Sequence, residues 1–145
     1  MMTVTAAAAF FLVAAGQPAV EYLPAPAINN TPAPFSSAVR VGDTLYLAGA
    51  IGIGADGKLP EGIEAQSKQT MDNIGAVLKR AGLGFDDVYK CTAFLADMKD
   101  WPAFNGVYVT YFKPDRRPSR SALGVNGLAL GALLEVECQA YAGKK

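Results

Sequence analysis

Three charged side chains lie in two apolar, strand-like runs near the end of the chain, where charges are uncommon. Arg120 falls in the run from Ser119 to Val125, and Glu135 and Glu137 fall in the run from Ala132 to Tyr141. Side chains alternate along a strand, so the two glutamates share one face while apolar residues share the other. Because carboxylates buried without a partner are costly, we expect a cation near them, and Arg120 is the candidate. These residues form either a structural ion pair or part of a ligand site.

The composition restricts which side chains could carry out chemistry. The chain has 145 residues and no histidine, which excludes Ser-His and Cys-His nucleophilic pairs and histidine-ligated metal sites. Acid-base chemistry must therefore come from Glu, Asp, Lys, Tyr or Cys. Cys91 and Cys138 lie in separate apolar runs and match no metal or redox spacing. We predict that they are two small buried hydrophobic residues.

Two short motifs resemble binding sites but lack the context for them. The segment from Lys113 to Arg120 packs four basic residues into eight, and the glycines from Gly52 to Gly57 fit the spacing of a dinucleotide-binding loop. Thirteen basic residues balance thirteen acidic ones in the whole chain, whereas nucleic-acid-binding domains usually have a basic excess. No helix follows directly on the glycine motif. We interpret both segments as solvated loops and expect no nucleic-acid partner.

The first residues of the chain resemble a targeting segment. Residues 1–19 contain a ten-residue apolar run from Ala6 to Ala15, followed by small residues. This run is too short to span a bilayer but has the length of a signal-peptide core, although the first basic residue is Arg40. The segment is either a remnant signal peptide or an apolar N-terminal extension. The first interpretation, which we favour, predicts an exported, periplasmic protein without a membrane anchor after processing; the second predicts a cytoplasmic one.

Residues 20–145 are predicted to form one α+β domain. After an extended, proline-rich lead-in, the patterns predict a hairpin that turns at Gly42-Asp43, a helix over Ile63–Ala81, a strand over Asp87–Asp97, a helix capped by Asp100 that ends at Lys113-Pro114, and the two final strands. Pro102 lies in the first turn of the second helix, where its missing N–H does no harm. This order predicts a mixed sheet with both helices packed on one face.

The final strands resemble the signature of a known family. The runs RPSRSALGV and LALGALLEVECQAY are similar to the Arg-Ser pair, Leu-Pro turn and Glu-hydrophobic-Glu strand of the reactive intermediate deaminases (Rid, also called YjgF-like or enamine/imine deaminases). The likeness continues upstream through VRVGDTLYLAGAIG, the first helix and FNGVYVTYF, and covers about residues 34–142. It implies the chorismate-mutase-like Rid fold, assembled as a homotrimer with ligand sites in clefts between subunits.

The resemblance also implies an activity. Rid deaminases hydrolyse 2-imino and enamine acids to 2-oxo acids and ammonia, with no metal or other cofactor. Arg120 matches the arginine that binds the substrate carboxylate, and Glu135 matches the glutamate that positions the hydrolytic water. Asn105 and Gly49 match positions that line the cleft.

This chain departs from the family pattern at several cleft positions. Phe35 stands where the deaminases carry a tyrosine, and Ala122 where they carry a cysteine. Ala48 and Ala50 replace a serine and a glutamine, and Ala129 replaces the proline of the Leu-Pro turn. A more apolar cleft favours imines with bulkier side chains, or a trimer that binds small carboxylates without turnover. Because the family also includes ribonucleases, an RNA-acting protein is a further alternative.

Overall fold

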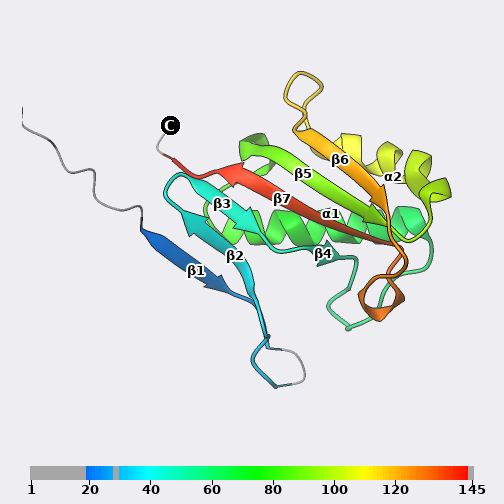
Figure 1. Cartoon of the computed structure of the whole chain (residues 1–145), viewed down its shortest axis with the longest axis horizontal. Helices are drawn as coiled ribbons and strands as arrows, with labels where there is room; N and C mark the ends of the chain where they lie inside the picture. Colours follow the sequence, from blue (N-terminus) through cyan, green and yellow to red (C-terminus); the bar gives the residue numbers. More distant parts are fainter. Residues whose placement is uncertain (1–18, 28–29, 144–145) are drawn as a thin grey trace, which may run out of the picture.

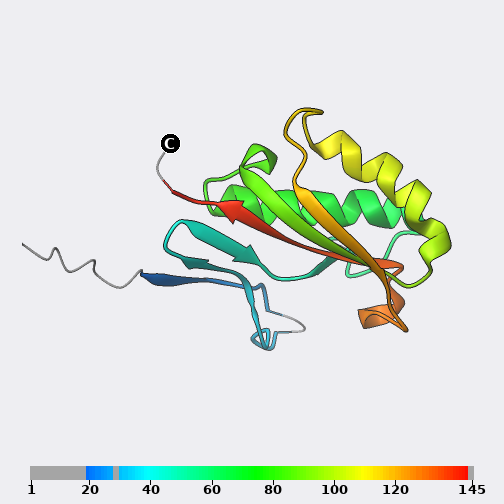
Figure 2. The same ribbon diagram turned by 45° about the horizontal axis from the view of Figure 1, so that its top comes forward.

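One mixed sheet carries both helices on the same face (Figures 1 and 2). The computed structural model describes residues 19–27 and 30–143, so nearly all of the predicted signal segment, residues 1–19, lies outside the described residues. The strands are β1 (Val20–Pro24), β2 (Ser36–Val41), β3 (Thr44–Leu47), β4 (Ala50–Ile51), β5 (Val88–Leu95), β6 (Ser119–Gly124) and β7 (Leu134–Tyr141), and the helices are α1 (Ile63–Arg80) and α2 (Trp101–Tyr108). Short 3₁₀ turns occupy Phe85–Asp87, Met98–Asp100, Val109–Tyr111 and Ala129–Gly131.

The strands lie in the order β1-β2-β3-β7-β5-β6, and β4 also pairs with β7. Among the described strands, β5 and β6 form the one parallel pair, and the other pairs are antiparallel. A parallel pair needs a crossover connection, which α2 provides between β5 and β6. The predicted α+β class, the mixed sheet and the position of both helices on one face are thereby confirmed. None of the helices among residues 19–27 and 30–143 is long and apolar enough to cross a membrane.

The strongest local patterns produce the expected elements. The predicted hairpin forms from β2 and β3, whose turn places Gly42 at a φ of 57°, a left-handed value that glycine adopts without strain. The first helix ends at Arg80, and Gly82 follows with a φ of 73°. The segment from Gly52 to Gly62 forms turns and loop between β4 and α1, as predicted.

The core lies between the sheet and the helices. Val136 on β7 and Ile74 and Leu78 on α1 are at most 1% exposed. On the other face of β7, Glu135 is half-buried and Glu137 is exposed. The alternation predicted for this strand is confirmed, and the glutamate-bearing face of the sheet is the one that carries no helix.

Two local predictions were incomplete. The lead-in before the hairpin begins with a strand, β1, which pairs with β2. Its residues are mostly exposed, so the sequence shows no alternation of apolar and polar side chains there. Asp100 lies at the N-cap position of α2 but its side chain makes no capping hydrogen bond. Instead, Asp97 accepts a hydrogen bond of 2.9 Å from the backbone N–H of Lys99 and caps the 3₁₀ turn that leads into the helix.

The two cysteines form a disulfide, which corrects the prediction of two small buried hydrophobic residues. Cys91 on β5 and Cys138 on β7 are directly opposite in the strand register, and their sulfur atoms are bonded. Their residues are 0% and 2% exposed, so the predicted burial is right and the predicted chemistry is wrong. The pairing depends on the register of two strands 47 residues apart, which no local pattern shows.

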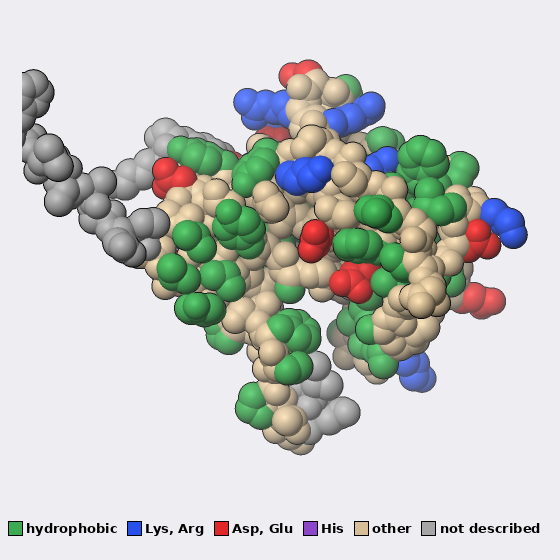
Figure 3. Space-filling view, in the orientation of Figure 1, with side chains coloured by type: hydrophobic (Ala, Val, Ile, Leu, Met, Phe, Trp, Pro, Cys, Tyr) green, Lys and Arg blue, Asp and Glu red, His purple; other side chains and the backbone are tan. Residues whose placement is uncertain are grey.

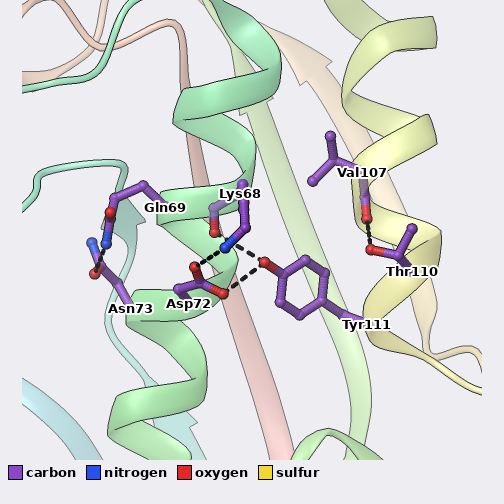
Figure 4. A network of polar contacts seen from close by, with 7 residues as sticks. All are labelled: Lys68, Gln69, Asp72, Asn73, Val107, Thr110 and Tyr111. Carbon is purple, nitrogen blue, oxygen red and sulfur yellow. Dashed lines mark hydrogen bonds and ion pairs between the residues drawn. The ribbon is translucent and has the colours of Figure 1, made fainter.

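A polar network fixes the end of α2 against α1 (Figure 4). The Tyr111 hydroxyl lies 2.7 Å from Oδ1 of Asp72 and 3.1 Å from the carbonyl oxygen of Lys68. Lys68 also forms an ion pair with Asp72 one helical turn away. Burial, together with the Asp72 carboxylate, raises the pKa of Tyr111 well above its usual range, so its hydroxyl stays neutral. This network helps to hold α2 at a defined position over β6.

Candidate functional site

Arg120 is held on the helix-facing side of the edge strand β6. Its Nη2 donates a hydrogen bond of 2.6 Å to Oδ1 of Asn105. Its guanidinium carbon lies 4.5 Å from the ring centroid of Tyr108 and 5.3 Å from that of Phe104. We call these four residues the arginine group. Ala122, two residues further along β6, shares this side of the strand.

The α2 sequence explains how the arginine group forms. Residues three and four apart on a helix lie on the same face, so Phe104 and Tyr108 present neighbouring rings, and Asn105 lies beside them. A guanidinium over an aromatic face is attracted by the negative face of the ring. Arg120 has five N–H donors, and the hydrogen bond to Asn105 is the one its side chain makes within the described residues. The remaining donors suit the two oxygens of a carboxylate.

Glu135 belongs to a second group of predicted site residues. A Cβ atom at Gly49 would overlap the Glu135 carboxylate, so the glycine lets this carboxylate lie against the backbone between β3 and β4. Gly49 and Phe35 line the same cavity. We call Phe35, Gly49 and Glu135 the glutamate group. No hydrogen bond or ion pair from the described residues engages the Glu135 carboxylate.

The structure separates the two groups, so the expectation that Arg120 is the cation near the glutamates is wrong within one chain. Arg120 faces α2, whereas Glu135 and Glu137 lie on the face that carries no helix. The register aligns Arg120 with Cys91 and Cys91 with Cys138. β7 lies two strand spacings from β6, and Glu135 lies three residues from Cys138 along β7. The Cα atoms of Arg120 and Glu135 are therefore about 14 Å apart. No ion pair joins Arg120 to either glutamate in the part of the chain that the structure describes.

The distance between the arginine group and the glutamate group limits which ligands one chain can bind. The arginine group offers cationic donors, and the glutamate group offers a carboxylate beside an apolar cavity. A small carboxylic acid cannot contact both groups of the same chain at once. The predicted site is therefore split into two parts within one chain.

Comparisons with known proteins agree with this fold. A family model described as Endoribonuclease L-PSP matches residues 26–142. The solved structure of YyfA from Yersinia pestis, described as a member of the conserved Rid protein family, superimposes with a TM-score of 0.77 at 35% sequence identity, covering 85% of this chain and 99% of that one. The chain belongs to the Rid family. Two mammalian relatives, from Mus musculus and Capra hircus, are named 2-iminobutanoate/2-iminopropanoate deaminase. They are 40% and 42% identical over 112 residues, which is 76% of this chain and 82% and 81% of theirs.

In this Rid protein the sequence did not reveal two members of the arginine group. Phe104 and Tyr108 lie four residues apart on an apolar helix face, a pattern that by itself indicates core, and they are core residues, at 0% and 4% exposed. The Tyr108 hydroxyl is buried and has no hydrogen-bond partner among the described residues. Burial raises the pKa of Tyr108 to about 12, although the nearby Arg120 acts in the opposite direction. The pattern that could have indicated their role is the presence of two aromatic residues, Phe104 and Tyr108, beside Asn105 on the same helix.

Proposed function

We propose that this chain hydrolyses 2-imino acids to 2-oxo acids and ammonia. The observation that carries the proposal is the Arg120 guanidinium, which Asn105 and two aromatic rings hold while most of its donors stay available. An arginine fork held in this way suits a carboxylate, because little side-chain freedom is left to lose on binding. The relatives named for 2-iminobutanoate and 2-iminopropanoate support the same chemistry.

In the proposed reaction Arg120 binds the substrate carboxylate and Glu135 positions a water molecule against the imine carbon. Glu135 accepts a proton as the water oxygen bonds to this carbon, and the electron pair of the C=N bond moves to nitrogen. The proton returns from Glu135 to the nitrogen to give a neutral carbinolamine, and Glu135 then transfers the hydroxyl proton to the same nitrogen. The C–N bond breaks as the C=O bond forms, and ammonia leaves. A positioned general base of this kind typically contributes about 10²–10⁴-fold to a rate.

The proposed reaction requires more than one chain, and we propose a homotrimer in which Arg120 of one chain faces Glu135 of the next. The separation of the two groups supports a site shared between chains. The helix-free face of the sheet also exposes large apolar side chains, among them Tyr22, Tyr46, Leu123 and Tyr141 (Figure 3). Such patches mark interaction surfaces. We expect sedimentation at three times the chain mass of 15.2 kDa.

Mixing two inactive variants tests the activity and the shared site together. We expect the native protein to accelerate hydrolysis of imines generated in situ by an amino-acid oxidase, and Arg120→Ala and Glu135→Gln each to lose this activity. When the two variants are unfolded and refolded together at equal amounts, half of the arginine groups and half of the glutamate groups are intact. In a ring of heterologous contacts, each site takes its arginine group from one chain and its glutamate group from the next. About a quarter of the sites therefore have both parts intact, and about a quarter of the native activity should return.

The mixing experiment contains its own control. Refolding each variant alone should restore nothing, since every site then lacks the same part. If the mixture also stays inactive while the native protein refolds to full activity, the site does not lie between chains. If the native protein does not accelerate hydrolysis of any imine, the enzymatic proposal is wrong.

Tyr108 is expected to act as a positioning residue for Arg120. Tyr108→Phe keeps the ring under the guanidinium and removes a hydroxyl without a partner, so 2-oxo-acid affinity should stay within about twofold of native. Tyr108→Leu removes the ring, and the loss of about 0.5–2 kcal/mol of cation–π attraction should weaken binding by about 2–30-fold. Isothermal titration with 2-oxobutanoate measures both. Equal weakening by the two variants would assign Tyr108 a purely structural role.

One observation favours binding without turnover. Phe35 in the glutamate group and Ala122 beside the arginine group cannot donate hydrogen bonds, so fewer groups are available to move protons. A protein that binds 2-oxo acids with normal affinity but does not hydrolyse imines would support this alternative.

An RNA-acting role has weaker support. The Lys113 ammonium pairs with Asp86 and lowers the pKa of that carboxyl, which leaves Arg116 and Arg117 as the exposed cations of the basic loop. An RNA-cleavage assay run beside the imine assay separates the two activities.

We also propose export to an oxidising compartment. The buried Cys91–Cys138 disulfide supports this, because such bonds persist mainly outside the reducing cytosol. Cell fractionation that recovers the protein only with cytosolic markers would contradict it.

A further inference from the structure

We propose that the apolar cavity beside the glutamate group binds the substrate side chain and selects 2-imino acids with branched aliphatic or aromatic side chains. The inference rests on the proposed function and adds a substrate class to it. The cavity has a volume of about 490 Å³. Its lining includes Phe35, Ala48, Ala50, Ile51, Val77 and Leu130.

The cavity lies next to the proposed reacting groups. Gly49 lines it and also lies directly against the Glu135 carboxylate. Its walls come from the segment after β1, the β3–β4 connection, α1 and the 3₁₀ turn before β7. Figure 3 shows a hollow at the lower edge of the helix-free face of the molecule. A substrate whose imine carbon lies near Glu135 can therefore extend its side chain into this cavity.

The polar side chains that line the cavity have other partners. Asn73 donates hydrogen bonds of 2.9 and 3.0 Å to the carbonyl oxygens of Ile51 and Ile53, and its own oxygen accepts one from Gln69. The Ser37 hydroxyl donates to the carbonyl oxygen of Pro24. None of the described residues that line the cavity is charged. A polar or charged ligand side chain would lose its hydration there without gaining a partner, whereas an apolar one would not.

The size of the cavity matches a large side chain. An apolar protein cavity of about 150 Å³ is enough to bind benzene. At about 490 Å³, this cavity has room for an isobutyl or benzyl group. A methyl group, as on the imine derived from alanine, would leave most of it empty.

The first test compares 2-oxo acids on the native protein by isothermal titration. Each methylene placed in a hydrophobic pocket is worth about tenfold or more in discrimination. We therefore expect 4-methyl-2-oxopentanoate and phenylpyruvate to bind at least about 10-fold more tightly than pyruvate. Equal affinities for all three would overturn the inference and leave the proposed function intact. Binding of none of them would instead contradict the proposed function.

A pair of matched variants assigns the preference to this cavity. Val77→Phe fills it from α1 and should weaken binding of phenylpyruvate by about 10-fold or more while pyruvate affinity stays unchanged. Val109→Phe makes the same substitution at an exposed valine outside the cavity and should change neither affinity. If Val77→Phe weakens both acids equally, or if both variants behave alike, the side chain does not bind in this cavity. The native ligand series remains decisive if Val77→Phe does not fold.

Discussion

Replacing Arg120 with alanine should weaken 2-oxo-acid binding by roughly 30-fold or more, because truncating one partner of a hydrogen-bonded charge pair typically costs 2–5 kcal/mol. Stability should change far less. Among the described residues, Arg120 makes one side-chain hydrogen bond, to Asn105, stacks on two rings and pairs with no glutamate. Its removal therefore leaves no buried carboxylate uncompensated. We expect a loss of about 1–2 kcal/mol, or a drop in Tm of about 3–8 °C.

Arg120→Lys is the matched control for this result. Lysine restores the charge but not the planar fork that can bind both carboxylate oxygens, so affinity should recover only in part. Calorimetric titration and thermal unfolding of the same samples measure both effects. A structural ion pair would behave in the opposite way, since breaking one costs about 3–5 kcal/mol. A large fall in Tm with intact 2-oxo-acid binding would therefore remove Arg120 from the ligand site.

Removing the disulfide should have the largest effect on stability. The Cys91–Cys138 bond closes a loop of 47 residues, for which the chain-entropy model gives about 4 kcal/mol of stabilisation. The double replacement Cys91→Ala and Cys138→Ala should lower Tm by about 10 °C or more. Each single replacement should lower stability nearly as much as the double one, because either change breaks the same bond.

Chemical denaturation with and without a thiol reductant checks this prediction. The native protein should lose stability in the reductant, once unfolding exposes the sulfur atoms, whereas the double variant should not respond. Since both cysteines are at most 2% exposed, reduction under native conditions should be slow. Free thiols in the unfolded, unreduced native protein, together with additive effects of the two single variants, would show that the bond does not form.

Much of this structure was predictable from local patterns in the sequence. The β2–β3 hairpin, α1, β5 and the alternation along β7 each follow from side-chain periodicity within a few residues, because an apolar face must be buried whatever its partner. The sequence also predicted individual residues of the candidate site. Arg120 and Glu135 stand out as charges in apolar strands, and the resemblance to the Rid family implied roles for them and added Asn105 and Gly49. The comparisons confirm the family.

Only the tertiary structure decided how these residues are combined. Periodicity shows that a strand has two faces but does not show which faces of distant strands align. The parallel pairing of β6 with β5 directs Arg120 toward α2, whereas β7 presents Glu135 on the opposite face. The same register places Cys91 opposite Cys138. The residues of β1 are mostly exposed, so the sequence there has no periodic pattern of apolar side chains that would predict a strand. Strand register is a long-range property set by packing and pairing. It places Arg120 and Glu135, which the sequence assigned to one site, on two different surfaces.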